Sequence, residues 1–168
     1  MAKVFSEESN PTTKAALPRR LVAMLYDTLI CAALMLATTG IYMAISSSIV
    51  GAENYEKMVE AGATTNDPLL SSILFIMLYG FFGYFWTRTG QTLGMQVWHI
   101  RIQNKNAVSI SWLQALLRFM MAIISLLCFG LGFLWMLIDK EGMTWHDRFS
   151  ESVVVRISKK KNKIKITI

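Results

Sequence analysis

The feature that most constrains this chain is an apolar stretch that begins at Leu21 and continues to about Ile45. A helix rises about 1.5 Å per residue, so about 20 apolar residues are enough to cross a hydrocarbon core of about 30 Å. Pro18, just before the stretch, suits the first turn of a helix. The stretch is too long for the apolar core of a signal peptide, so we expect a retained membrane-spanning helix.

Composition places the whole chain in the membrane class. Hydrophobic residues make up 54% of the 168 residues and charged residues 17%, and the apolar residues are gathered in long runs. Basic residues flank these runs, so the formal net charge of +6 favours contact with anionic lipid headgroups over nucleic acid binding. Two cysteines and two histidines predict no disulfide framework, no metal site and no cofactor.

A second apolar run, Leu69 to Trp86, contains no charged residue and predicts a second spanning helix. The segment between the two runs, 52–68, is predominantly acidic, whereas the rest of the chain carries the excess of Lys and Arg. The positive-inside rule therefore places this segment outside the cell and both chain ends in the cytoplasm. We expect a multi-pass protein of the cell (inner) membrane.

The third apolar region, Trp112 to Ile138, admits two arrangements. It is long enough to cross once, but a single crossing would put the strongly basic tail after Asp139 outside. A bend at Cys128–Gly132 would instead form a helical hairpin, with helices at about 111–127 and 132–139, that enters and leaves on the cytoplasmic side. We favour the hairpin and keep the single crossing as the alternative.

Alternation of polar and apolar residues predicts short strands at the cytoplasmic surface. Val97–Ile102 and Val108–Ser111, joined by a turn at Gln103–Asn106, predict a β-hairpin, and Ser152–Ile157 and Lys163–Ile168 are expected to join the same sheet. The predicted fold is an all-α integral membrane protein with two full transmembrane helices, a third membrane-embedded helical region and a small cytoplasmic β-hairpin or sheet.

Three segments follow from this pattern. Residues 1–16 are polar and predict a flexible cytoplasmic N-terminal segment. Residues 17–157 form the membrane domain, and residues 158–168 form a basic C-terminal tail close to anionic headgroups.

Charged residues at or inside the apolar segments are the candidate functional residues. Asp27 follows Arg20 by close to two helical turns, so the two share one face but lie about 10 Å apart along the axis. Each is expected to meet a partner from elsewhere in the chain. We expect Asp147 to fold back onto Arg20 or Arg118 and to close the bundle around Asp27. Three further residues can support this network: His146, Arg148 and Asp139.

Asp27 has two possible roles. An ionisable residue inside an apolar segment costs about 2.5 to 3.5 kcal/mol to insert, so its presence needs a reason. It can bind a proton or a cation, or it can be a buried structural acid that fixes helix packing. The residues themselves leave both roles open.

The order and spacing of these residues resemble the RDD family of small membrane proteins. The family is named for an arginine at the start of the first helix, an aspartate within that helix and a second aspartate. The match extends over about 17–156, and the segments that carry it are Arg20, Asp27, Gly90-Gln91-Thr92-Leu93-Gly94, Leu116-Leu117-Arg118, His146-Asp147-Arg148 and Val153-Val154-Val155. Met95 and Gln96 stand where the family commonly places a basic residue.

The resemblance implies a multi-pass fold and, for some members, cation/proton antiport. Two spans and a hairpin form a thin bundle, so a transport path would require a homo-oligomer or a larger membrane partner. We therefore expect a structural, assembly or regulatory membrane component. The alternative is a cation/proton antiporter or transport subunit that uses Asp27. We expect no enzyme, because the adjacent His146 and Asp147 do not by themselves specify a nucleophile and an oriented base.

Overall fold

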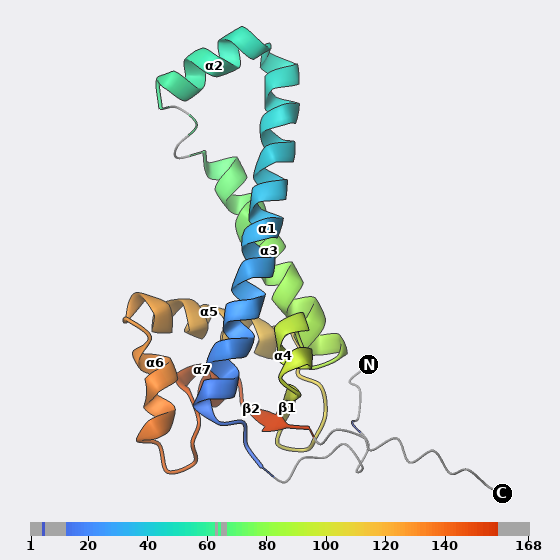
Figure 1. The fold of residues 1–168 in the computed structure, drawn as a ribbon, viewed down its shortest axis with the longest axis vertical. Helices are drawn as coiled ribbons and strands as arrows, with labels where there is room; N and C mark the ends of the chain where they lie inside the picture. Colours follow the sequence, from blue (N-terminus) through green and yellow to red (C-terminus); the bar gives the residue numbers. More distant parts are fainter. Residues whose placement is uncertain (1–4, 6–12, 63, 65–66, 158–168) are drawn as a thin grey trace, which may run out of the picture.

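The computed structural model describes residues 5, 13–62, 64 and 67–157. Two long helices, α1 (Leu17–Val50) and α3 (Pro68–Arg88), cross each other and form a stalk, and most other elements gather at one end of it (Figure 1). This end is termed the platform. It contains the first turns of α1 together with α4 (Leu93–Val97), β1 (Ile100–Asn104), α5 (Trp112–Leu127), α6 (Leu131–Leu134), the 3-10 helix η2 (Trp135–Leu137), α7 (Trp145–Phe149) and β2 (Ser152–Arg156).

The stalk consists of the two helices predicted to span a membrane. α1 has 34 residues and α3 has 21, and both are long and apolar enough to cross a bilayer. The Asp67 side chain caps α3 by accepting hydrogen bonds from the backbone N–H groups of Leu69 and Leu70. At the far end of the stalk, α2 (Ala52–Glu60) follows α1, and the Tyr42 hydroxyl donates a hydrogen bond to Asp67.

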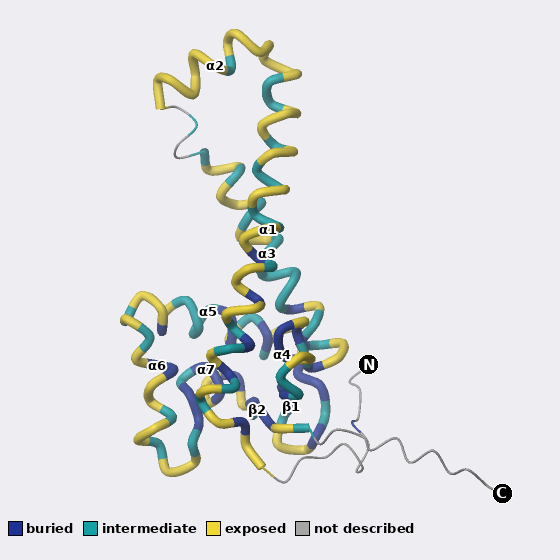
Figure 2. The backbone as a smooth tube through the Cα atoms, viewed as in Figure 1, coloured by how far each residue is buried: buried dark blue, intermediate teal, exposed yellow. Residues whose placement is uncertain are grey.

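Burial is concentrated in the platform (Figure 2). The buried residues of α1 are Arg20, Ala23, Asp27 and Cys31, which all lie in its first half and share one face. The platform core gathers apolar side chains from several elements, including Ile100, Ile102 and Val154 of the two strands, Ala115 of α5 and Trp86 of α3.

β1 and β2 form a two-stranded antiparallel sheet in which Ile102 faces Val154. The prediction that Ser152–Ile157 contributes a strand is therefore confirmed, but the predicted hairpin between Val97–Ile102 and Val108–Ser111 is wrong. Asn104 does close a tight turn after β1, because its side-chain oxygen accepts hydrogen bonds from the backbone N–H groups of residues 106 and 108, but β1 pairs along its whole length with β2. The predicted strand Lys163–Ile168 lies outside the described residues.

Residues 5 and 13–16 of the N-terminal segment are packed, and the rest of the predicted flexible lead-in lies outside the described residues. Lys14 forms a β-bridge with Val155, and Ala15 N–H donates to the Val154 carbonyl over 2.9 Å. Phe5 is buried, and its N–H donates to the Ala107 carbonyl over 3.0 Å. The segment before α1 therefore covers the edge of β2 that β1 leaves open.

The third apolar region bends where the hairpin was predicted to bend. α5 and the α6–η2 pair are separate helices at 109° to each other, and Gly130 has a left-handed φ of 78° at the break. The region starts beside α3 and ends beside the start of α1, where Lys14 Nζ donates to the Glu141 carbonyl over 2.5 Å. Both ends thus lie at the platform end of the stalk, although the angle is closer to a right angle than to an antiparallel hairpin.

Candidate functional site

Asp147 lies at the centre of the candidate site, on the short helix α7. Thr144 begins this helix: its hydroxyl accepts a hydrogen bond from Asp147 N–H, and its own N–H donates to Asp147 Oδ2, both over 3.3 Å. This reciprocal arrangement is a capping box with an aspartate in the third position. The cap fixes the carboxylate of Asp147, which is fully buried.

Two arginines from different helices converge on this carboxylate. Arg20 of α1 donates to Asp147 Oδ2 over 2.5 Å, and Arg118 of α5 donates to Oδ1 over 2.6 Å. Both guanidinium side chains are only 6% exposed. Arg20, Arg118 and Asp147 together are termed the clasp, because they join α1, α5 and α7.

The remaining donors of the arginines extend the clasp to the sheet. Arg20 Nε donates to the Ala15 carbonyl over 3.0 Å, and another Arg20 nitrogen reaches the Val154 carbonyl over 3.5 Å. Arg118 also donates to the hydroxyl of Ser152 over 2.7 Å and lies over the Trp86 ring, with its Cζ 5.5 Å from the ring centroid. One buried carboxylate thus organises three helices and a strand.

Electrostatics keeps Asp147 ionised. Burial alone would raise the pKa of this carboxyl, but the charges of Arg118 and Arg20 outweigh burial and hold its pKa well below its ordinary value. His146 next to it is buried, and burial together with the charge of Arg118 lowers the pKa of its imidazole to about 3. The histidine is therefore neutral at neutral pH, and it packs against Phe133 with ring centroids 4.7 Å apart.

Asp27 lies outside the clasp and has a different set of partners. Its Oδ2 accepts a hydrogen bond from the Thr92 hydroxyl over 2.5 Å, and its Oδ1 accepts one from Gly94 N–H over 2.9 Å. Thr92 caps α4, so Asp27 fastens the start of α4 to α1. Among the described residues no ion pair joins Asp27 to Arg20 or Arg118, and the clasp does not close around it.

Gly94 allows this contact. A Cβ at this position would lie 2.3 Å from the Ala23 carbonyl oxygen and 2.9 Å from Asp27 Oδ1, closer than side-chain atoms pack. The backbone of α4 can therefore approach α1 only with glycine at this position.

The other two candidate residues, Asp139 and Arg148, form a separate pair at the surface of the platform. Arg148 donates to Asp139 Oδ1 over 2.5 Å, and Asp139 Oδ2 accepts from Met143 N–H over 2.8 Å. The hydrogen bond from Met143 and the charge of Arg148 lower the pKa of Asp139, against the opposing effect of burial. This pair orders the loop before α7 and does not touch the clasp.

Four residues of the site were not identified from the sequence: Thr92, Gly94, Thr144 and Ser152. Thr144-x-x-Asp147 carries a recognisable signal, because a threonine three residues before an acid is typical of a helix cap. The Gly90–Gly94 segment was named only for its resemblance to the family, without a contact to Asp27. Ser152 gives no local signal, because its role depends on the pairing of β2 with β1 and on the position of α5.

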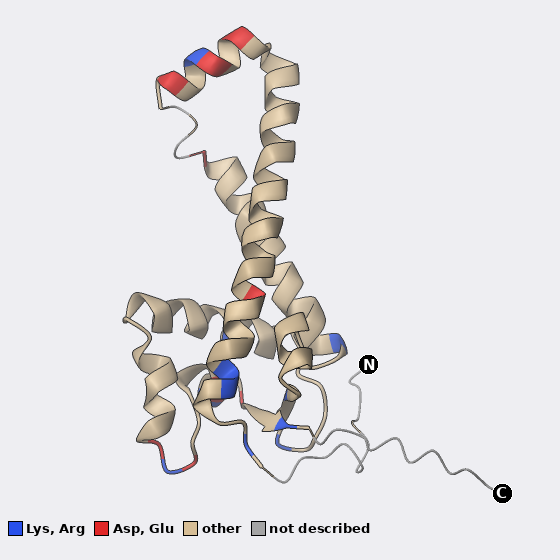
Figure 3. Ribbon diagram, viewed as in Figure 1, with Lys and Arg blue, Asp and Glu red and all other residues tan. Residues whose placement is uncertain are grey.

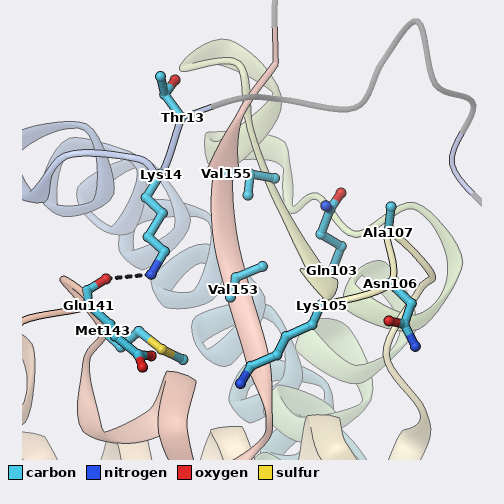
Figure 4. A pocket seen from close by; sticks show the side chains of 10 residues that line it. All are labelled: Thr13, Lys14, Gln103, Lys105, Asn106, Ala107, Glu141, Met143, Val153 and Val155. Carbon is cyan, nitrogen blue, oxygen red and sulfur yellow. Dashed lines mark hydrogen bonds between the residues drawn. The ribbon is translucent and has the colours of Figure 1, made fainter.

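A groove of about 600 Å³ lies elsewhere on the platform, over the exposed side of β2 (Figure 4). Lys14 and Glu141 stand on one wall and Lys105 on the other. Among the described residues, neither the three clasp residues nor Asp27 line this groove. The described residues also contain no cluster of three or more His, Cys, Asp or Glu side chains placed to hold a metal ion.

Comparison with protein-family models matches residues 14–151 to the RDD family. Comparisons with curated proteins and with solved structures gave no match. The matched region contains α1 through α7, with the clasp arginines, Asp27 and Asp147. Because the match covers most of the chain, and because its two long apolar helices suit a family of membrane proteins, this protein belongs to the RDD family.

Proposed function

We propose that this protein is a structural, assembly or regulatory component of the cell (inner) membrane, in which α1 and α3 span the bilayer and carry the platform on the cytoplasmic side. α3, with 21 residues, is about 31 Å long and matches a hydrocarbon core of about 30 Å. Asp67 and Arg88 stand at its two ends, where headgroups and water begin.

Charge supports this orientation. The α2 end of the stalk carries Glu53, Glu56 and Glu60, whereas Lys and Arg residues gather at the platform end (Figure 3). The positive-inside rule places the platform, and with it both ends of the chain, in the cytoplasm. Its basic residues then face the anionic headgroups of the inner leaflet rather than nucleic acid.

The observation that carries the proposal is that the buried acids are already held by protein donors. Asp147 accepts from Arg20, Arg118 and Thr144 N–H, and Asp27 accepts from Thr92 and Gly94. A carboxylate that carries ions must bind a cation and a proton in turn, and it has to release its protein donors to do so. Short hydrogen bonds to fixed helices oppose this release. A carboxylate that joins helices needs the bonds to be permanent.

Partners follow from the shape of the stalk. Two helices leave most of their apolar surface exposed: Leu36, Ile41, Ile49, Leu69 and Ile76 are at least 60% exposed. Lipid covers such surface in part, and a homo-oligomer or a larger membrane protein can cover the rest. We expect the protein to act within such an assembly, without a catalytic site of its own.

One observation favours a second candidate, a cation/proton antiporter or transport subunit. Asp27 lies near the inner end of the spans and, among the described residues, is not neutralised by a Lys or Arg. An acid without a permanent counter-charge is the kind of group that alternates between a proton and a cation.

The two candidates differ in what Asp27→Asn does. Purified parent, Asp27→Asn and the exposed-acid control Glu53→Gln are compared at equal, verified folded amounts in sealed vesicles. Proton movement is followed in sodium, potassium and lithium gradients. We expect no cation-dependent proton movement by the parent, and reduced accumulation of folded Asp27→Asn. Flux by the parent and by Glu53→Gln that is lost in well-folded Asp27→Asn would establish the antiporter instead.

A further inference from the structure

We propose that Trp112–Leu137, here termed the arm, lies within the cytoplasmic leaflet only, with α5 along the membrane plane and the acyl chains of that leaflet as its partner. The inference rests on the proposed placement of α1 and α3 across the bilayer. It assigns an interaction surface to the third apolar region of the chain, which neither crosses the membrane nor belongs to the soluble side.

α5 exposes a row of large apolar side chains and buries its only charged one. Its outer face carries Leu113, Leu117, Ile124 and Leu127, which are 66%, 42%, 45% and 76% exposed. Its buried face carries Arg118 and the fully buried Ser125 beside the apolar Ala115 and Phe119. A helix in water exposes its charged residues and buries such an apolar row, so this outer face requires an apolar surrounding.

The apolar surface continues around the bend. Phe129 at the break is 95% exposed, and Ile138 just past η2 is 80% exposed. Between Trp112 and Ile138 the only charged residue is Arg118, and it is held inside the clasp. Four more apolar side chains of α6 and η2 are at least 42% exposed: Leu131, Leu134, Trp135 and Leu137.

Contacts with α3 set the depth of the arm. The Tyr79 hydroxyl donates to the Trp112 carbonyl over 3.1 Å, and the Phe75 and Phe119 rings lie 5.7 Å apart. Along the helix axis Tyr79 is about 14 Å and Phe75 about 20 Å from Arg88, at the cytoplasmic end of α3. The contacting side chains Phe75 and Tyr79 thus belong to the middle of α3, and α5 packs beside them on the membrane side of Arg88, above the headgroup level.

The far end of the arm returns to the same side. Glu141, shortly after the arm ends, is bonded through its carbonyl to Lys14, which precedes α1. A third crossing would separate these two residues by the thickness of the bilayer, about 30 Å. Figure 1 shows the resulting course: α5 runs across the foot of the stalk, and α6 descends from its outer end.

Acyl chains are the occupant that these observations favour. The exposed face of the arm is apolar like the exposed surface of α1 and α3, and its exposed side chains carry no charge by which a partner would be recognised. A second copy of the chain covering this face is the competing arrangement, which the experiment below separates.

The test uses the full chain in vesicles of phosphatidylethanolamine and phosphatidylglycerol, with Cys31 and Cys128 replaced by alanine and one reporter cysteine added. A fluorophore at Phe129→Cys is exposed to lipid brominated at mid-chain and, separately, to aqueous iodide on both sides. Lys140→Cys, Lys105→Cys and Glu56→Cys are labelled from either side with an impermeant maleimide. The chain with both native cysteines replaced by alanine is used only if its elution volume in size-exclusion chromatography and its melting temperature equal those of the parent chain.

We expect the Phe129→Cys fluorophore to lose most of its emission with brominated lipid and to be insensitive to iodide. Lys140→Cys should react from the same side as Lys105→Cys and from the side opposite to Glu56→Cys. Iodide quenching at 129, reaction of Lys140→Cys from the Glu56 side, or protection of 129 from both quenchers in a protein dimer would each overturn the proposal. Reaction of Glu56→Cys and Lys105→Cys from one common side would instead refute the membrane placement of the stalk.

Discussion

The two halves of α1 both contain apolar runs, but their surroundings are very different. Its platform half contains Arg20, Ala23, Asp27 and Cys31, all buried, whereas its stalk half contains no buried residue. The platform half is held by directional contacts to carboxylates and backbone groups, whereas the stalk half meets its surroundings mainly through apolar surface, with one hydrogen bond from Tyr42 to Asp67. The comparison teaches that an apolar run can be part lipid-facing span and part protein core. Substitutions should therefore be costly in the platform and tolerated in the stalk.

The largest difference is expected between Asp147→Asn in the platform and Glu53→Gln at the α2 end. Asp147→Asn leaves two buried arginines without their counter-charge, which typically costs about 3–5 kcal/mol. Glu53 is 83% exposed and paired only with Lys57, so its loss should leave stability unchanged. The melting temperature of each variant in detergent checks this. Parent-like melting of Asp147→Asn would remove the distinction between the two regions.

Two glycines provide a comparison that involves no charge. Gly94→Ala places a methyl group against the Ala23 carbonyl and Asp27, and this overpacking is expected to cost about 1–3 kcal/mol or more. Gly80→Ala in the stalk meets nothing within 4 Å and replaces glycine inside a helix, so its stability should equal or slightly exceed that of the parent. Thermal unfolding of both variants gives the answer. Equal losses at the two sites would show that α4 does not pack on α1 as described.

Much of the fold could be predicted from the sequence, because hydropathy and turn residues act locally. The stalk helices, the bend near Gly130 and a strand within Ser152–Ile157 all follow from short windows of sequence. The partner of β1 could not be predicted in this way. Alternation marks a strand but does not say which other strand it pairs with, and the Asn104 turn resembled the turn of a local hairpin.

The charged residues of the candidate site could be predicted from the sequence, but their uncharged partners could not. Arg20, Arg118 and Asp147 were identified because charges are conspicuous in apolar segments, and the structure places Asp147 between both arginines rather than against one. The partners of Asp27 were missed because a hydroxyl and a glycine N–H are not conspicuous. Their role depends on how closely α4 approaches α1, which is a property of the tertiary structure.

His146 predicts a smaller, pH-dependent difference. Its pKa is lowered to about 3 in the folded protein, while an unfolded histidine titrates near 6.5. Between these values the unfolded state binds the extra proton, so stability falls as the pH falls, by up to about 1.4 kcal/mol per pH unit. Between pH 7 and pH 5, the melting temperature of the parent should therefore fall more steeply with falling pH than that of His146→Gln. Identical slopes would show that His146 is accessible to protons in the folded platform.

The most direct test of the account is a double-mutant cycle between Arg20→Met and Asp147→Leu, measured as unfolding free energies in one detergent. The exposed pair Lys57→Met and Glu53→Leu, from the α2 end, serves as the comparison cycle. If the clasp holds the platform together, the Arg20 and Asp147 changes are coupled by about 0.5–3 kcal/mol, so that the double variant loses less than the sum of the single losses. The comparison cycle should be close to additive. Full additivity of Arg20→Met and Asp147→Leu would contradict the account.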